Sequence, residues 1–316
     1  MKKHFLSSTD NYHEHKLDSL VWEITLSVML EDPKSPCRSV LLKGDSFGNL
    51  LYDFLSTVIP LDIIHRLIEI GGGYGYLTRD FLMRSKKMDA TMIDISPFLL
   101  SQQRETLRDF PVQFVKGNFL DIDDSVVSGA DLAILNEVIG DFPAACEISK
   151  NVLFEGSDPE DALLQEVRRI YKSYSIAPPE SERFTVNIGA IQAVEKLCAA
   201  RIPYIYISEH SCEARVPKDL SGLLDITTTG EPERIRLHGH DEYTIRFSDL
   251  EKVASSFGYT FKRGQYLDFI KPVIEGEVAF VLCLGSSRIA RYEIIQQFIE
   301  DLVKYEYLIL SLPAQK

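Results

Sequence analysis

The sequence predicts an α/β protein, with a mostly parallel central sheet and helices on both faces of the sheet. Two observations carry this prediction. Short apolar segments alternate with amphipathic ones along most of the 316 residues, and residues 66–70 (RLIEI) run directly into a glycine-rich turn. A strand, a glycine turn and a helix, in this order, form the opening unit of an open α/β sheet. We therefore expect a Rossmann-like architecture.

The expected elements follow in chain order. Residues 1–60 are expected to form an N-terminal helical segment, with one helix in 20–30 that ends before Pro33 and another over 48–58. The Rossmann-like domain is expected to occupy 61–143 and 184–316. Its helices are expected after the glycine turn, after Ser96, and over 188–200, 248–257 and 289–303. Its expected strands are 66–70, 90–95, 112–115, 130–135, 204–208, 266–270, 278–284 and 307–312.

Residues 144–183 interrupt this alternation. The stretch is rich in charge, contains Pro159, Pro178 and Pro179, and has a helical pattern between them. We interpret it as a helical insertion, and it follows the fourth predicted strand directly. An insertion at that point is placed to act as a lid over an acceptor site.

Charge and cysteine content exclude several classes of protein. Lys and Arg number 34 and Asp and Glu number 47, so the net charge is −13, which disfavours nucleic acid as a partner. The longest apolar runs, such as 278–284, are too short for a membrane helix, and no apolar stretch follows the first lysines. Five cysteines without a C-x-x-C pair favour reduced thiols and a cytoplasmic location. Whether the chain is a monomer or a homodimer stays open here.

The glycine turn has the pattern E-x-G-x-G-x-G, formed by Glu69, Gly71, Gly73 and Gly75. A dinucleotide fingerprint would need a third glycine at Tyr76, and a P-loop would need a lysine after the glycines. The pattern resembles motif I of class I S-adenosylmethionine-dependent methyltransferases. This resemblance implies that the glycines let the backbone approach the cofactor and that Glu69 lies near its amino group. The alternative is a glycine-rich turn in another α/β fold.

The ends of the next two predicted strands carry further residues that are suited to binding the cofactor. Asp94 ends the second strand, followed by Ile95, at a position where a carboxylate can accept both ribose hydroxyl hydrogen bonds. Asp94 could instead be a helix cap. Asn118 and Phe119 follow the third strand; the family usually has an acidic residue there, and the amide oxygen of Asn118 can accept the same bond from adenine. We therefore expect S-adenosyl-L-methionine as the cofactor.

The fourth strand ends in 136–143 (NEVIGDFP), which resembles the N-E-x-x-D-A-x-P segment of the MidA-like family. Mitochondrial members of that family are protein arginine methyltransferases that act in respiratory complex I assembly. The family aspartate falls on Gly140, and Asp141 comes one place late. Residues 241–259 resemble a second family segment. The resemblance implies that Glu137 pairs with a guanidinium and that Asn136 and Asp141 are further catalytic candidates. The alternative is that Asn136 and Glu137 only close the cofactor pocket.

The sequence thus predicts a methyltransferase that acts on a protein side chain, with an arginine-type acceptor favoured. The alternatives are a small-molecule O- or N-methyltransferase and a methyltransferase-like binding or assembly factor without turnover. Against an O-methyltransferase, the fourth strand is followed by no histidine that could act as the catalytic base. We expect no metal, because methyl transfer from a sulfonium needs no Lewis acid, and we expect 13–15 (HEH) to be a solvated segment. The alternative metal site is a zinc site formed by His210, Cys212, His238 and His240.

Overall fold

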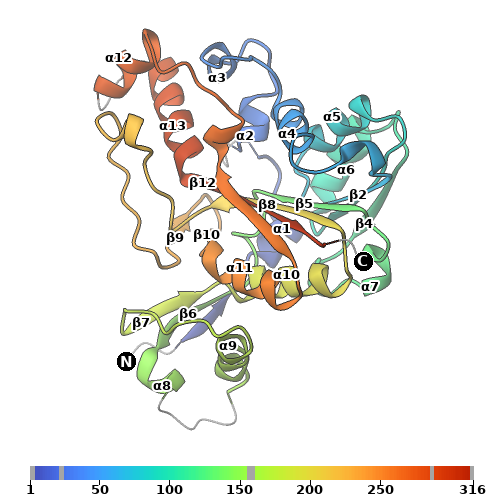
Figure 1. Ribbon diagram of the computed structural model, residues 1–316, viewed down its shortest axis with the longest axis vertical. Coiled ribbons are helices and arrows are strands. Elements are labelled where there is room, and N and C mark those ends of the chain that lie inside the picture. Colours follow the sequence, from blue (N-terminus) through green and yellow to red (C-terminus); the bar gives the residue numbers. More distant parts are fainter. Residues whose placement is uncertain (1–3, 21–24, 155–160, 285–287, 314–316) are drawn as a thin grey trace.

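In the computed structural model, which describes residues 4–20, 25–154, 161–284 and 288–313, a sheet of seven strands lies between two layers of helices (Figure 1). The strand order is β11-β12-β8-β5-β2-β3-β4. The five strands from β8 to β4 are parallel, β12 runs antiparallel to β8, and β11 runs antiparallel to β12. The strands are β2 (Arg66–Ile70), β3 (Asp89–Asp94), β4 (Val112–Lys116), β5 (Leu132–Asn136), β8 (Tyr204–His210), β11 (Thr260–Gln265) and β12 (Tyr305–Ser311).

The order of the strands reverses between β2 and β5. From β2 the chain proceeds outward through β3 to β4, and it then returns to β5 on the opposite side of β2. In open α/β sheets, such a reversal leaves a crevice outside the carboxyl ends of the strands, and ligands bind there. The topology therefore predicts a ligand-binding site at the loops that follow β2, β3, β4 and β5.

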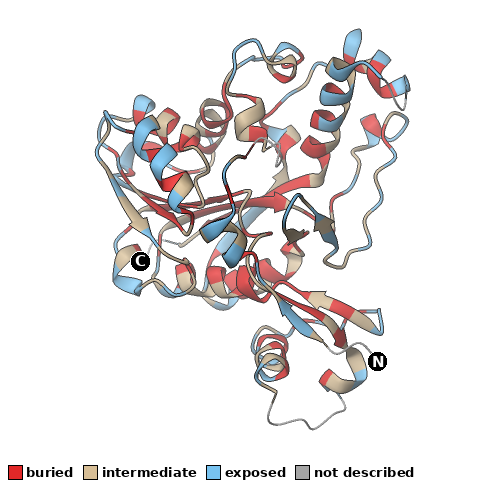
Figure 2. Ribbon diagram, turned by 180° about the vertical axis from the view of Figure 1, so that it is seen from behind, coloured by how far each residue is buried: buried red, intermediate tan, exposed pale blue. Residues whose placement is uncertain are grey.

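Each face of the sheet has its own hydrophobic core, because successive side chains along a strand point to opposite faces. In β2, Leu67 belongs to one core and Ile68 to the other; in β8, Tyr206 and Ile207 are divided in the same way. Figure 2 shows the central strands buried along almost their whole length. The first core includes α4 (Phe47–Leu55), α5 (Tyr76–Arg84) and α13 (Ala290–Lys304), and the second includes α10 (Ile188–Ala199) and α11 (Phe247–Ser256).

Two of the predicted strands are wrong. Residues 278–284 form the helix α12 (Glu277–Leu284), in which Val278, Val281 and Leu282 recur at helical spacing and pack beside α13. Residues 266–270 contain only a 3₁₀ turn, and the strand is β11, immediately before it. β11 is a largely exposed edge strand of sequence TFKRGQ, so it lacks the apolar pattern of a buried strand. Of the helix expected over 20–30, α2 (Leu26–Met29) is observed; residues 21–24 lie outside the described residues.

The insertion contains strands as well as helices. It begins with β6 (Ala144–Ser149), continues through α8 (Lys150–Phe154) and α9 (Ala162–Ser173), and leads into β7 (Arg183–Val186). β6 is the centre of a three-stranded antiparallel sheet whose other edge is β1 (Phe5–Ser7). In Figure 1 this small sheet and α8 and α9 project from the main body. The N-terminal segment is therefore paired with the insertion through β1.

The remaining features concern membrane helices, cysteines and short elements. Within the described ranges, no helix is both long and apolar enough to span a membrane. All five cysteines are free thiols, and all except Cys283 are buried. The short elements are α1 (Asp10–His15), α3 (Pro36–Ser39), α6 (Pro97–Thr106), α7 (Asp124–Val127), β9 (Arg234–Arg236), β10 (Asp241–Tyr243) and the 3₁₀ turns Leu61–Ile63, Lys218–Leu220 and Tyr266–Asp268.

Candidate active site

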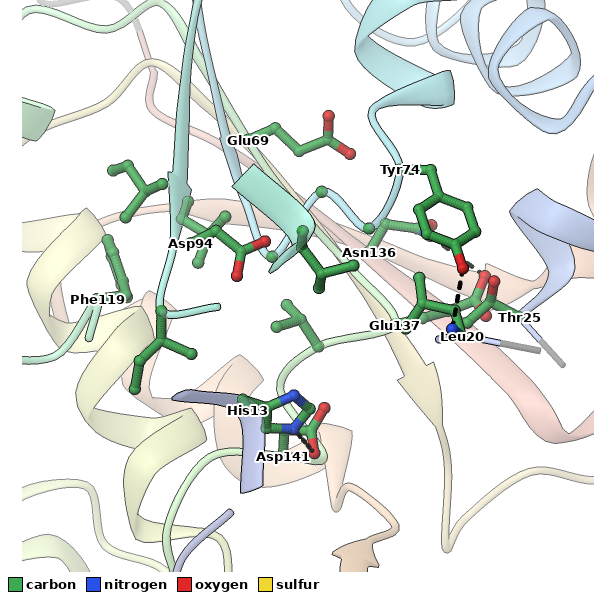
Figure 3. A pocket seen from close by; sticks show the side chains of 18 of the residues that line it. His13, Leu20, Thr25, Glu69, Tyr74, Asp94, Phe119, Asn136, Glu137 and Asp141 are labelled. Carbon is green, nitrogen blue, oxygen red and sulfur yellow. Dashed lines mark hydrogen bonds and ion pairs between the residues drawn. The ribbon is translucent and has the colours of Figure 1, made fainter. Parts of the chain in front are cut away.

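A cavity with about 980 Å³ of empty space lies at the carboxyl ends of β2, β3, β4 and β5 (Figure 3). The N-terminal segment forms a further wall, through residues between Thr9 and Ser27. All the predicted site residues except Gly75 line the cavity: Glu69, Gly71, Gly73, Asp94, Ile95, Asn118, Phe119, Asn136, Glu137 and Asp141.

The glycine turn connects β2 to α5 through left-handed backbone conformations. Gly71, Gly73 and Gly75 have φ angles of 65°, 51° and 82°, which residues with a Cβ rarely adopt. A Cβ on Gly71 would also lie 2.3 Å from Cγ2 of Val138. Gly75 is the N-cap of α5 and packs against Leu107 instead of the cavity. The turn therefore needs glycine for its own conformation and for its packing against the loop after β5.

Glu69 lies near the end of β2, just before this turn, and its side chain is almost fully buried (2% exposed). The hydroxyl of Thr78 in α5 donates a hydrogen bond to Oε2 of Glu69. Burial raises the pKa of Glu69 to about 7, although Thr78 acts in the opposite direction. The carboxyl group therefore titrates near neutral pH.

Asp94 is held rigidly at the end of β3. Its Oδ1 accepts a hydrogen bond from the Ser96 backbone N–H at 2.9 Å, and its Oδ2 accepts one from Nε2 of Gln103 at 2.8 Å. Burial raises the pKa of Asp94 to about 6, against the effect of these two donors. Ser96, and not Asp94, caps α6, since its hydroxyl accepts from the Leu99 N–H. Asp94 is thus not the cap of this helix.

Gln103 is a site residue that the sequence analysis missed. Its Nε2 donates both to Asp94 and to the carbonyl oxygen of Gly73, at 3.1 Å from the latter. One buried amide therefore fixes the carboxylate of β3 relative to the glycine turn of β2. A glutamine in the second turn of the helix predicted after Ser96 gave no signal of this role.

Asn118 and Phe119 form the wall that follows β4. Oδ1 of Asn118 accepts from the Leu120 backbone N–H at 3.0 Å, and its Nδ2 donates to Asp10 at 3.4 Å. The Phe119 ring is 3% exposed and stacks on Phe142, with centroids 6.3 Å apart. This wall therefore combines the flat, apolar ring of Phe119 with the polar side chain of Asn118.

Asn136 is oriented by a residue of β8 and a residue of the 3₁₀ turn Tyr266–Asp268. Its Oδ1 accepts from the hydroxyls of Ser208 and Tyr266, at 3.0 and 3.1 Å. This leaves Nδ2 to donate to Oε1 of Glu137 at 3.2 Å. The amide therefore presents a donor to the carboxylate beside it.

Glu137 lies at a strained backbone position. Its φ is 53°, a left-handed value that is uncommon outside glycine. Its Oε2 accepts a hydrogen bond from the Leu26 backbone N–H at 3.1 Å. Burial raises the pKa of Glu137 to about 7, and the charge of Asp301 acts in the same direction. The Leu26 N–H and the Asn136 amide oppose this change.

The expectation that residues 13–15 form a solvated segment is wrong for His13. His13 Nε2 lies 2.9 Å from Asp141 Oδ1, and its side chain is 11% exposed. On the other side, His240 Nε2 lies 3.4 Å from the same oxygen. Burial alone would raise the pKa of Asp141, but the two histidines outweigh it and hold that pKa well below its usual range. A histidine therefore does adjoin the segment after the fourth strand, and it comes from α1.

Neighbouring charges also determine the pKa of His240. Burial acts to lower its pKa, but the carboxylates of Asp141 and Glu242 outweigh burial and raise the pKa to about 10. Among the described residues, His210, Cys212, His238 and His240 do not bring three ligand atoms close enough together to hold a metal ion, and the Cys212 thiol is buried and donates to the Ile245 carbonyl. His210 lies 3.7 Å from Asp301.

The N-terminal segment covers the cavity by polar contacts with its walls. Thr9 Oγ1 donates to the Asp141 carbonyl at 2.9 Å, and the Leu20 N–H donates to the Tyr74 hydroxyl at 3.0 Å. Among the described residues of 144–183, none lines the cavity. The lid role of the insertion stays a prediction, and the observed cover is the segment that sequence analysis treated as a separate extension.

No protein-family model matches this chain, and no curated protein sequence matches it either. Two solved structures from Burkholderia thailandensis are similar to it. An uncharacterized COG1565 superfamily protein has 15% identity and a TM-score of 0.55, over 91% of this chain and 87% of that one. A second COG1565 superfamily member, bound to S-adenosyl-homocysteine, has 14% identity and a TM-score of 0.52, over 88% and 77%. The predicted Rossmann-like class I methyltransferase fold is thereby confirmed.

Proposed function

We propose that this protein is an S-adenosylmethionine-dependent methyltransferase. The observation that carries the proposal is the convergence of four adjacent strand ends on one cavity. Each end contributes a side chain that the sequence predicts to bind the cofactor: Glu69 from β2, Asp94 from β3, Asn118 after β4 and Asn136 from β5. The similarity in fold to a protein bound to S-adenosyl-homocysteine supports the same function.

The residues present fit such a cofactor. Asp94 offers carboxylate oxygens to the ribose hydroxyls, and two fixed donors already set its orientation. The flat ring of Phe119 suits the adenine, and Glu69 suits the cationic amino group. When bound, the cofactor supplies an activated methyl group on a sulfonium. The chain supplies positioning and exclusion of water, which account for most of the acceleration in an in-line displacement.

We assign the acceptor as a nitrogen atom of a cationic side chain, with an arginine side chain favoured; the methylated nitrogen gives up one proton in the transfer. Five carboxyl groups line the cavity, those of Asp10, Glu69, Asp94, Glu137 and Asp141, and only Asp141 among them is paired with histidines, so the other walls favour positive groups. Glu137 is the carboxylate that would pair with a guanidinium and orient one nitrogen toward the methyl group. The hydrogen bond from the Asn136 amide would keep Glu137 in place during that step.

A small-molecule acceptor is the second candidate, and His13 favours it. The segment after the fourth strand lacks the histidine that serves small-molecule O-methyltransferases as a base, but α1 places His13 on the cavity wall beside Asp141. An aspartate that orients an imidazole is a common arrangement for a general base.

Incubation with methyl-labelled S-adenosylmethionine and either a protein or a metabolite extract tests the proposal. We expect wild-type protein to transfer label to the protein fraction, and Asp94→Ala to transfer much less. Asp89→Ala is the matched control, because Asp89 is exposed at the other end of the same strand. Label in the metabolite fraction alone would favour the second candidate. Cofactor binding without transfer to either fraction would contradict methyltransferase activity.

A further inference from the structure

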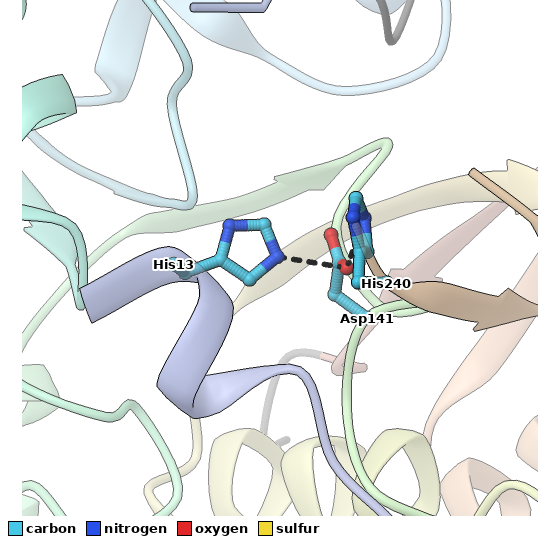
Figure 4. Close-up of side chains that lie close together, drawn as sticks. All are labelled: His13, Asp141 and His240. Carbon is cyan, nitrogen blue, oxygen red and sulfur yellow. Dashed lines mark hydrogen bonds and ion pairs between the residues drawn. The ribbon is translucent and has the colours of Figure 1, made fainter. Parts of the chain in front are cut away.

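Three side chains from separate parts of the chain meet at one wall of the cavity (Figure 4). His13 comes from α1, Asp141 from the loop after β5, and His240 from the turn before β10. The Nε2 atoms of both histidines approach the same oxygen, Oδ1 of Asp141, to 2.9 and 3.4 Å. Among the residues that the structure describes, no other three metal-ligating side chains are so close together.

We infer that His13, Asp141 and His240 form a binding site for a divalent transition-metal ion. Two imidazole nitrogens and one carboxylate oxygen are a donor set that binds zinc, iron and cobalt. An ion about 2.1 Å from each ligand places ligands in adjacent positions about 3.0–3.4 Å apart. The two distances from the histidine nitrogens to Asp141 Oδ1, 2.9 and 3.4 Å, match this spacing, and all three ligand atoms lie within 4.8 Å of one another, so that a small movement of the histidines brings them onto one ion.

The surrounding structure holds His240 in this position. A Cβ on Gly239 would lie 2.6 Å from Cε2 of Tyr12, and its φ of 96° also requires glycine. The Tyr12 ring stacks on the His240 ring, with centroids 4.2 Å apart. Oε1 of Glu242 lies 3.4 Å from His240 Nε2 and forms a further contact that fixes the imidazole. The turn that carries His240 is therefore fitted to the helix that carries His13.

The site is shielded from solvent but adjoins the cavity. The side chains of His13, Asp141 and His240 are 11%, 16% and 3% exposed, so little water competes for their ligand atoms. His13 and Asp141 also line the cavity. Three protein ligands leave coordination positions for an outside group. A water or an acceptor hydroxyl bound to the ion there would lose its proton more readily. This activation of an acceptor rests on the proposed function, whereas the binding of the metal ion does not.

Titration of the metal-free full-length protein with Zn²⁺ and Co²⁺ tests the inference. We expect one ion per chain with a Kd in the micromolar range or tighter, and visible d–d absorption bands from Co²⁺. His13→Ala and His240→Ala should each weaken binding by about a hundredfold or more, as expected for loss of a ligand. His15→Ala is the matched control, since His15 lies in the same helix with its side chain 67% exposed. It should bind as the wild type does.

X-ray absorption of the zinc-loaded wild type provides a measurement that needs no variant. It should show two imidazole ligands and no sulfur ligand. Absence of one-to-one binding, a sulfur ligand, or unchanged binding in folded His13→Ala and His240→Ala would overturn the inference. Calorimetry with S-adenosyl-homocysteine on the same metal-free protein separates the two proposals, because that binding depends on Asp94 and not on the ion.

Discussion

Replacement of Glu69 by glutamine should make the protein more stable at alkaline pH. Glu69 is buried, and its pKa is raised from 4.5 to about 7, so the native state binds its proton more tightly than the unfolded chain does. Between these two pKa values the native state holds more protons, and stability therefore falls as the pH rises. The glutamine side chain in Glu69→Gln keeps the shape of the original and an oxygen for the Thr78 hydroxyl, but it cannot ionise.

The magnitude follows from the two pKa values. Each tenfold change in acidity is worth about 1.4 kcal/mol, so ionisation of Glu69 costs the native state about 3 kcal/mol at pH values well above 7. Between pH 5 and pH 8 the free energy of unfolding of the wild type should fall by about 2.5 kcal/mol relative to Glu69→Gln. The comparison between the two proteins removes the similar contributions of Asp94 and Glu137, which titrate in the same region.

Urea denaturation of both proteins at pH 5, 6, 7 and 8 measures this difference. Glu105→Gln is the control, because Glu105 is an exposed residue of α6, and its curve should run parallel to that of the wild type. A pH-independent difference between wild type and Glu69→Gln would refute the reasoning. It would show that Glu69 ionises in the native state as readily as it does in the unfolded chain.

Three further predictions concern the cavity. Asp94→Ala should weaken S-adenosyl-homocysteine binding about ten- to a hundredfold by calorimetry, through loss of charge-assisted bonds worth about 1.5–3 kcal/mol; equal affinity would contradict its role. Glu137→Gln should reduce turnover of a cationic acceptor about a hundredfold with little change in cofactor affinity; full turnover would make Glu137 a structural residue only. Gly71→Ala should destabilise the protein by about 1–3 kcal/mol more than Gly230→Ala. Both positions have positive φ, but a Cβ contacts a neighbour only at Gly71. Equal losses in urea denaturation would show that this contact is relieved without cost.

Sequence analysis predicted those parts of the site whose positions depend on residues that are close together in the chain. β2, the glycine turn and α5 are consecutive in the chain, and the pattern E-x-G-x-G-x-G determines where the turn lies. Asp94 and Asn136 end their strands, so a parallel sheet brings them to one edge whatever else surrounds them. Apart from Gly75, which faces Leu107, the predicted residues accordingly line a single cavity.

The parts that sequence analysis missed depend on contacts between distant segments. His13 and Asp141 are 128 residues apart, and tertiary contacts hold the N-terminal segment near the loop after β5: β1 pairs with β6, and the Thr9 hydroxyl donates to the Asp141 carbonyl. The strands β6 and β7 of the insertion could not be distinguished from its helices, because β6 pairs on one side with β1, which lies about 140 residues earlier in the chain, and β7, among the described strands, pairs only with β6. α12 was mistaken for a strand because its seven apolar residues in succession show no helical periodicity by themselves.

Calorimetric titration of the wild-type protein with S-adenosyl-homocysteine tests the central claim most directly, with NAD titrated in parallel. The arrangement of Asp94, Glu69 and the glycine turn predicts one-to-one binding of S-adenosyl-homocysteine in the micromolar range or tighter, displaced by S-adenosylmethionine, and no heat with NAD. Binding of NAD, or no binding of S-adenosyl-homocysteine by folded protein, would contradict the assignment of this cavity to a methyl donor.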